Sequence, residues 1–431
     1  MIINANYSSP IKGEGTSFFP NVQEGKLDFV LAGLQTLVPV IADLLAPNLE
    51  QQKKSGYFHT LREICQQPMT WLGTATFLFS MAEEVQDYLS KTGVSQQGGT
   101  ILLTGSGSSE YVGECLKLSL QEALKGPAQV VPCGAILTHP AQSIPPHSPC
   151  LFVSFARSGD SPESYGSIEI ILKKEAGYFP LIVTCNPRGR IVEAFGKASR
   201  VLAIVLDEKT CDRSLVMTSS FTNMVLAGRF LAMAAAPEEF GRKVRALADS
   251  AQVLLTGYAE PLAAIAREKF DSVVYLGSGA RFGGARESAL KMLEMTAGHV
   301  ITFAESFLGV RHGPMSAIHP GTLLVCFLAS DPLVRAYEID LIHELNRKNL
   351  GMKKVVVGEG IPAQALNEKD LAIECPGMGE IGDDNVPVLD VMVGQLLAFF
   401  RCLHMGFQPD APSSEGVISR VVGSFPIYQT D

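Results

Sequence analysis

Three charged residues in the second half of the chain have the types and the spacing needed to move a proton. Glu287, Lys291 and Glu294 occur in the run Glu-Ser-Ala-Leu-Lys-Met-Leu-Glu, and on a helix they share one face at i, i+4 and i+7. An ordinary ion pair on a solvated helix face has the same pattern. Proton transfer between two neighbouring carbons next to a carbonyl group, however, needs a carboxylate base and a cation that stabilises the oxyanion. This helix carries both groups.

Two turns rich in glycine and serine in the first half could bind a phosphate group. They span Gly105–Ser109 and Arg157–Ser161. Glycine lets the backbone approach an anion, the first N–H groups of a helix are unpaired, and serine hydroxyls add further donors. For the second turn alone, an ordinary helix N-cap at Ser161 explains the pattern equally well. Two such turns at neighbouring strand ends of one sheet favour ligand binding. The candidate phosphate ligands are Ser108, Ser109, Arg157, Ser158 and Ser161.

Neither turn fits a nucleotide-binding fingerprint. The motif GxGxxG fails because Glu110 stands at its last position, and the matching turn of the second half has Phe282 there. No GxxxxGK[ST] motif occurs, so we expect no nucleotide or nicotinamide cofactor. No cluster of His, Asp and Glu with ligand spacing stands out either, and we expect no metal site.

The elements that must position these residues follow from the alternation of short β-branched runs with helical patterns, which is typical of parallel sheets covered by helices. We predict an α/β protein with two doubly wound parallel-sheet domains, 81–245 and 246–431, after an N-terminal helical segment, 1–80. Strands are predicted at 101–104, 129–132, 151–155, 181–184 and 201–205, and then at 272–276, 300–303, 323–328, 354–357 and 371–374. Helices are expected at 222–236 and 391–402, among others.

The two domains look like copies of one another. Gly105-Ser-Gly closes a strand-like run in the first half as Gly277-Ser-Gly does in the second, and Ser158 and Ser330 follow these glycines at the same distance. An equal register over such a length indicates an internal duplication.

The second copy has lost the phosphate-binding residues. Ala280 and Arg281 stand where the first copy has two serines, and Ser-Asp-Pro replaces Ser-Gly-Asp in the second turn. We therefore predict one phosphate site per chain, in the first half.

Composition narrows the class of protein. The 431 residues are 46% apolar and carry a formal net charge of −9, which predicts large buried cores and argues against nucleic acid as a partner. The nine cysteines form no CxxC pair and several lie in apolar runs, as buried free thiols in a reducing cytoplasm do. The N-terminus has no secretory signal, and the apolar stretch 29–42 is too short to span a bilayer. We expect a cytoplasmic protein without a membrane partner, and a helix kinked near Pro39 in that stretch.

With these turns, the sequence resembles the sugar isomerase (SIS) domain proteins. Its tandem arrangement, over roughly residues 55–425, resembles the isomerase half of glucosamine-6-phosphate synthase. The segments starting at Thr60, Arg157 and Met217 look closest to the tagatose-6-phosphate ketose/aldose isomerase group, also described as galactosamine-6-phosphate deaminase/isomerases. The resemblance implies flavodoxin-like SIS domains and a phosphosugar isomerase, or a deaminase/isomerase that makes tagatose-6-phosphate and ammonia from galactosamine-6-phosphate. The sequence alone does not choose between these two reactions.

The resemblance also implies catalytic roles. Glu294 matches the glutamate that transfers the proton between C1 and C2, and Lys291 matches the lysine beside it. His312, in Arg-His-Gly-Pro, matches a histidine that assists ring opening and is donated by the neighbouring subunit. This implies shared active sites in at least a homodimer.

Two positions depart from the pattern of the synthase. That enzyme ends with a lysine that acts in ring opening, whereas no lysine follows Lys369 here. Arg420 is the nearest counterpart, and an arginine can only stabilise charge or bind phosphate. Ala156 replaces a phosphate-loop serine, so the neighbouring Arg157 could hold the phosphate instead. The residues before the first SIS repeat are too few for a glutamine-hydrolysing domain, and we expect no glutamine-dependent synthesis.

The alternative from another class is a regulatory SIS protein that binds a sugar phosphate without converting it. Such a sensor would keep the serine turns but could dispense with Glu294 and His312, and it would commonly carry a DNA-binding helix-turn-helix. The joint presence of Glu294 and His312 in an acidic chain favours an enzyme.

Overall fold

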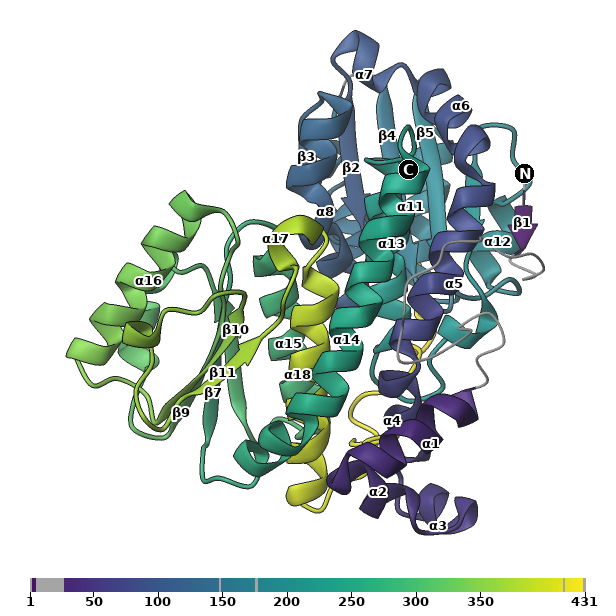
Figure 1. Ribbon diagram of the computed structural model, residues 1–431. Coiled ribbons are helices and arrows are strands. Elements are labelled where there is room, and N and C mark those ends of the chain that lie inside the picture. Colours follow the sequence, from purple (N-terminus) through teal and green to yellow (C-terminus); the bar gives the residue numbers. More distant parts are fainter. Residues whose placement is uncertain (1, 5–26, 147–148, 175–176, 414, 429–431) are drawn as a thin grey trace.

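Two parallel sheets with helices around them make up the protein (Figure 1). The computed structural model describes residues 2–4, 27–146, 149–174, 177–413 and 415–428. Part of the predicted N-terminal segment, and of the N-terminus considered for a secretory signal, therefore lies outside the described residues. In spatial order the first sheet contains β1 (Ile2–Asn4), β6 (Leu202–Val205), β5 (Tyr178–Thr184), β4 (Cys150–Ala156), β2 (Thr100–Thr104) and β3 (Ala128–Val130). The second contains β11 (Leu371–Glu374), β10 (Lys353–Gly358), β9 (Thr322–Phe327), β7 (Ser272–Leu276) and β8 (Ile301–Glu305).

The predicted fold class is confirmed, and every predicted strand is present, with ends that differ by up to three residues. Strand β1 was not predicted: its three residues pair in parallel with β6 at the edge of the first sheet. Without β1, the two sheets have the same strand order, which is the arrangement that an internal duplication requires.

The first turn of each half confirms the duplication at the level of the backbone. Gly107 has φ 56° and ψ −126°, and Gly279 has φ 58° and ψ −131°. A positive φ of this size favours glycine. Each of these glycines precedes the equivalent helix of its half, which is α8 (Ser108–Leu124) in the first and α15 (Ala280–Met295) in the second.

Helices precede the first sheet and connect its strands. The predicted helix over 29–42 is not a single kinked one: Val38 is extended and Pro39 begins a new helix, because the residue before a proline is driven out of the helical region. The helices before β2 are α1 (Leu27–Leu37), α2 (Pro39–Leu45), α3 (Leu49–Lys54), α4 (Phe58–Cys65), α5 (Gln67–Ser80), α6 (Ala82–Thr92) and α7 (Val94–Gln97). Those of the first half continue with α9 (Cys133–Thr138), α10 (Pro140–Ser143), α11 (Pro162–Leu172), α12 (Arg190–Phe195) and α13 (Ser219–Leu231).

A layer of long helices lies between the two sheets (Figure 1). Helix α14 (Pro237–Ala266) packs against α5 and against α18 (Pro387–His404), and α15 packs against both α18 and α8. The proposed division after residue 245 falls inside α14 and stays a prediction, since this helix contacts both halves. The second half also contains α16 (Pro332–Arg347) and α17 (Met378–Ile381).

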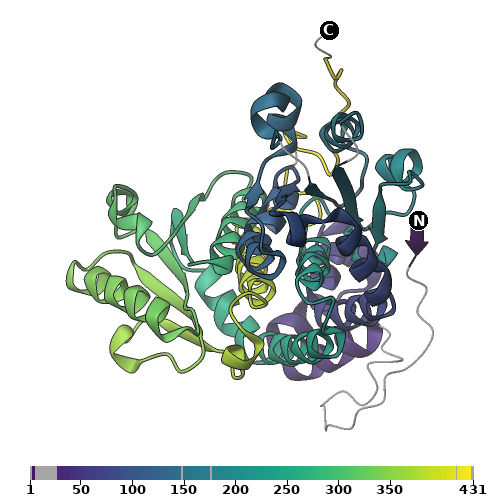
Figure 2. The same cartoon turned by 90° about the horizontal axis from the view of Figure 1, so that it is seen from above.

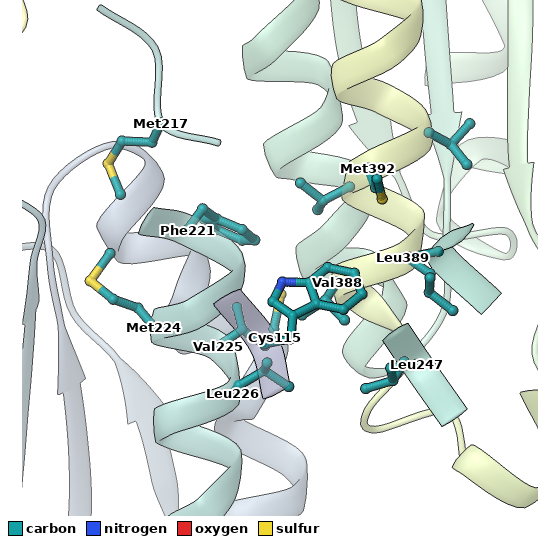
Figure 3. Packing of buried hydrophobic residues seen from close by; sticks show 14 of the residues in the cluster. Cys115, Met217, Phe221, Met224, Val225, Leu226, Leu247, Val388, Leu389 and Met392 are labelled. Atoms are coloured by element: carbon teal, nitrogen blue, oxygen red, sulfur yellow. The ribbon is translucent and has the colours of Figure 1, made fainter. Parts of the chain in front are cut away.

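The layer holds one hydrophobic core shared by the two halves. Of the helices described, α18 alone is long and apolar enough to cross a membrane, and 89% of it is buried inside the protein. Gly283 lets α15 approach α8, because a Cβ there would lie 2.5 Å from the backbone nitrogen of Cys115. Figure 3 shows side chains of four helices gathered in this core: Cys115 of α8, Phe221 and Val225 of α13, Leu247 of α14, and Val388 and Met392 of α18.

Arg281 stands in the second half at the position equivalent to Ser109 of the first half, and it forms a buried ion pair. Arg281 is fully buried, and its Nε and Nη2 donate to the two carboxylate oxygens of Asp390 in α18, at 2.8 and 2.7 Å. Its Nη1 lies 3.8 Å from Asp383. The guanidinium is thus neutralised from within the chain.

Asp390→Ala should lower the free energy of unfolding by about 3 kcal/mol, because it leaves the buried Arg281 without its bidentate partner. Urea unfolding followed by the fluorescence of the single tryptophan, Trp71, measures this. The matched control is Glu50→Ala, which removes the exposed Glu50–Lys53 pair and should cost less than about 1 kcal/mol. A similar small cost for Asp390→Ala would contradict the expected role of the pair.

Candidate active site

The two serine turns follow neighbouring parallel strands of the first sheet, as predicted. Strands β2 and β4 are parallel neighbours, so Gly105–Ser109 and Arg157–Ser161, which follow them, lie at adjacent carboxyl ends. Helix α15 of the second half reaches the same place, and Lys291 Nζ donates to Ser108 Oγ at 3.0 Å. The structure therefore brings the candidate phosphate turn of one half against the candidate catalytic helix of the other.

Lys291 lies between two carboxylates and is fully buried. Its Nζ is 3.1 Å from Glu287 Oε1 and 2.6 Å from Glu294 Oε2. Burial alone would lower the pKa of Lys291, but the charges of Glu287 and Glu294 raise it above its usual value. The group is therefore a cation at neutral pH. Since Lys291 and Glu287 are fully buried, these residues do not form an ordinary ion pair on a solvated helix face.

The two carboxylates differ in their access to solvent. The side chain of Glu287 is fully buried, whereas that of Glu294 is 22% exposed. Burial raises the pKa of Glu287 to about 7, although Lys291 opposes this shift. Glu294 is thus the carboxylate that a ligand can reach, and it lies beside a fixed cation. In the sequence, Glu287 belonged to the charged run but received no role of its own in the site. Its position four residues before Lys291 was the signal that could have indicated one.

The backbone of the second turn is held through its carbonyl groups. Ser158 O accepts from Asn186 Nδ2 at 2.9 Å, and Gly159 O accepts from the N–H of Ile191 at 3.0 Å. Within the described part of the chain, no acceptor receives the N–H groups of Ser158 and Gly159. A turn that is fixed in this way presents donors suited to an anion.

The corresponding turn of the second half has an anion of its own. The N–H of Ser330 lies 2.8 Å from both carboxylate oxygens of Asp383, and the N–H of Asp331 lies 3.1 Å from one of them. An internal carboxylate therefore accepts from the two backbone N–H groups that are equivalent to those of Ser158 and Gly159. This contact was not predicted, and it gives a physical reason to expect a single phosphate site, in the first half.

The serine hydroxyls of the two turns have different partners. Ser161 Oγ accepts from the N–H of Ser164 at 3.3 Å, which is the N-cap geometry weighed in the sequence. Ser158 Oγ accepts from the N–H of Asp160 at 3.2 Å, and Ser109 Oγ lies 3.9 Å from Met217 Sδ. The contact of Ser109 with sulfur is weak, so this buried hydroxyl has no strong hydrogen-bond partner among the described residues.

Arg157 and Arg420 lie together, although 263 residues separate them in the sequence. The guanidinium of Arg157 donates to the backbone carbonyl of Leu215 at 3.0 Å and to that of Arg420. Arg420 Nε in turn donates to the carbonyl of Asp212 at 2.8 Å. Both arginines predicted to act on the substrate therefore contact backbone carbonyls.

His312 lies on the surface of the chain. It follows a 3-10 turn, Gly309–Arg311, after the edge strand β8. Arg311 fixes this turn by ion pairs with Asp340 and Glu344 of α16, at 2.7 and 2.8 Å. The ring of His312 is exposed and forms no hydrogen bond with Lys291 or Glu294 in the described chain.

Sequence reasoning missed two buried acids beside the turns. The carboxylate of Asp212 accepts from the N–H and the hydroxyl of each residue in the run Thr218–Ser220, where α13 begins. Glu63 of α4 accepts from the N–H of Arg213 at 2.5 Å and from the hydroxyl of Ser214. Together these acids fix the loop 211–220 beside the phosphate turns. Glu63 did lie in a segment that supported the family resemblance.

A metal centre is not evident in the described ranges, where no group of three or more His, Cys, Asp or Glu side chains could hold an ion.

Residues 94–234 match the family described as SIS domain. D-galactosamine-6-phosphate deaminase AgaS of Escherichia coli O157:H7 is 33% identical over 377 residues, which are 86% of this chain and 95% of that protein. The crystal structure of tagatose-6-phosphate ketose/aldose isomerase from Escherichia coli matches with a TM-score of 0.76 and 32% identity, over 84% of this chain and 95% of that one. Glutamine–fructose-6-phosphate aminotransferase of Pyrobaculum aerophilum is 27% identical, over 84% of this chain and 58% of that protein. The resemblance predicted from the motifs is confirmed.

The pH dependence of stability should depend in part on Glu63. Burial and the nearby charge of Asp212 raise the pKa of Glu63 to about 8, although its hydrogen bonds with Ser214 and Arg213 oppose this. The native state therefore binds this proton more tightly than the unfolded state, and the free energy of unfolding falls as pH rises from about 5 to about 8. Glu63→Gln should make this fall less steep, by up to about 1.4 kcal/mol per pH unit, the limit for one proton.

Urea unfolding at several pH values between 5 and 9 tests this expectation. Glu83→Gln, at an exposed position of α6, is the matched control and should follow the wild-type curve. If the Glu63→Gln curve runs parallel to the wild-type curve, Glu63 does not carry the expected proton.

Proposed function

We propose that this chain, which belongs to the SIS domain family and is related there to the AgaS deaminases, is a phosphosugar isomerase that acts on an amino-sugar phosphate. The favoured reaction converts galactosamine-6-phosphate and water into tagatose-6-phosphate and ammonia. The observation that carries this proposal is the buried Lys291, held between Glu287 and Glu294 and bonded to Ser108 of a phosphate turn. A protein that only sensed a sugar phosphate would not need this arrangement.

The proposed chemistry is a proton transfer between neighbouring carbons. After His312 assists ring opening, Glu294 takes the proton from C2 of the open-chain sugar and returns it to C1. Lys291 stabilises the negative charge on the oxygen at C1 in the enediol-like intermediate. With an amino group at C2, this transfer together with the movement of a proton from the nitrogen at C2 to the oxygen at C1 gives an imine, which water hydrolyses to the ketose and ammonia. With a hydroxyl at C2, the same transfer is a plain isomerisation.

Phosphate binding is proposed at the serine turns of the first half. The N–H groups of Ser158 and Gly159 and the hydroxyl of Ser109 support this site, because they have weak partners or none in the described chain. The roles predicted for Ser108, Ser161, Arg157 and Arg420 as direct ligands or catalytic groups stay predictions from the sequence.

A homo-oligomer with shared active sites is the proposed assembly. His312 is exposed on a loop that a second copy could receive, and the apolar side chain of Leu308 on the same loop is also exposed, by 46%. A cytoplasmic location is supported by the nine cysteines, which are all free.

Purified protein should release ammonia and ketose phosphate in equal amounts from galactosamine-6-phosphate, and faster than from glucosamine-6-phosphate. Glu294→Gln should lower kcat by at least about 100-fold while substrate binding is retained, since the base is lost and the site keeps its shape. Glu122→Gln, at an exposed position of α8, is the matched control. Failure to convert any hexosamine or hexose phosphate, with binding retained, would favour the regulatory alternative.

Mixing two inactive variants tests the shared site. Glu294→Gln and His312→Ala subunits, co-refolded or co-expressed, should regain up to about one quarter of the wild-type rate if each site takes His312 from a neighbour in a dimer. The mixed protein should recover nothing if both residues act within one chain, and light scattering reports the assembly independently.

A further inference from the structure

We infer that Arg157 is a positioning residue that clamps the C-terminal tail and the loop 211–217 onto the phosphate site, and that it is not a phosphate ligand. The tail is the described part of the segment after α18, residues 405–413 and 415–428, which returns from the second half to the first (Figure 2). The name tail clamp is used here for Arg157, Ser214, Leu215 and Arg420. This inference rests on the proposed phosphosugar site and assigns a residue that shapes it.

The terminal nitrogens of Arg157 donate to backbone carbonyls of two other segments. Its Nη1 donates to Leu215 O at 3.0 Å and Ser214 O at 3.4 Å, and its Nη2 donates to Arg420 O. The side chain is buried, and burial lowers the pKa of Arg157, partly opposed by the charge of Asp212. A guanidinium presents its donors in a rigid planar fork, so one that serves three carbonyls on two segments fixes both segments at once.

The second arginine completes the clamp from the tail. Arg420 Nε donates to Asp212 O at 2.8 Å, and Arg420 Nη2 lies 3.4 Å from Cys211 Sγ. The tail is also tied to the same loop at Asp410, whose carbonyl accepts from the N–H of Leu215 at 3.0 Å. Arg420 and Asp410 of the tail thus both bind the loop that Arg157 holds.

The loop held by the clamp reaches the other phosphate turn. Met217 Sδ lies 3.9 Å from Ser109 Oγ, so the loop contacts the first turn through Met217 and the second through Arg157. Loss of the clamp would release the loop that contacts Ser109, whereas the N–H groups of Ser158 and Gly159 would keep their place. That turn is anchored separately, through its carbonyls, by Asn186 and Ile191.

The experiment compares Arg157→Met, Arg157→Lys and Arg420→Met in the full chain, with the exposed Arg242→Met of α14 as the control. Three quantities are measured: KM for galactosamine-6-phosphate, the Kd of inorganic phosphate, and the rate of tryptic cleavage after Arg213 and Arg420. Arg420→Met alters the tail clamp at a partly exposed residue. It therefore still tests the inference if the Arg157 variants fail to fold.

The clamp predicts that Arg157→Met and Arg157→Lys behave alike, because an ammonium cannot reach three carbonyls. Both should raise KM at least 10-fold, change the Kd of inorganic phosphate less than 3-fold, and speed cleavage after Arg420 at least 10-fold. Arg420→Met should raise KM similarly and speed cleavage after Arg213, and the double variant should show no further rise in KM. Arg242→Met should match the wild type.

A direct phosphate ligand would give the opposite pattern. Arg157→Met would then weaken the binding of inorganic phosphate as much as that of the sugar phosphate, and Arg157→Lys would keep much of both affinities. In the double variant, the effects of the two substitutions on KM would multiply. That result, or unchanged tryptic rates in the Arg157 variants, would overturn the inference. If no sugar phosphate is converted, the proposed function fails, while the tryptic rates and the Kd of inorganic phosphate still decide on the clamp.

Discussion

The buried charge of Lys291 constrains how the two halves of this protein can be joined. A lysine ammonium is costly to bury unless carboxylates and further hydrogen bonds surround it. Glu287 and Glu294 come from the same helix, but the remaining contact, Ser108, comes from the other half. Helices α8 and α15 must therefore lie in close contact, which Gly283 permits. Neither half alone could provide the site.

The need of polar groups for hydrogen-bond partners also explains how the duplicated halves diverged. The turns that follow the equivalent strands β4 and β9 both have backbone N–H groups that need an acceptor. In the second half Asp383 supplies that acceptor from within the chain. In the first half the corresponding groups of Ser158 and Gly159 have none among the described residues, and Asn186 holds the turn instead. One copy satisfies its backbone internally, and the other stays able to bind an anion.

The sequence predicted what local patterns determine. Strand positions follow from β-branched runs. The repeated Gly-Ser-Gly indicated the duplication, and the structure gives the reason that glycine stands there: Gly107 and Gly279 both have a positive φ. Contacts between segments far apart in the sequence were not accessible. Nothing in the periodicity of α4 indicates that Glu63 bonds to Ser214, or that Arg157 points to the tail. The short strand β1 escaped for a related reason: three residues carry too little pattern, and pairing with β6 alone defines it.

The exposure of the charged triad limits the direction from which a substrate can approach. The side chains of Lys291 and Glu287 have no accessible surface, so Glu294 is the one side chain of the triad that is partly exposed. If a sugar reacts here as proposed, its C1 and C2 must both face Glu294, so one group serves as base at the first carbon and as acid at the second. A single group that takes up and returns the proton acts on one face of the intermediate. The proton should therefore return to the face it left, because Glu287 is sealed behind Lys291 and cannot supply a second base from the other side.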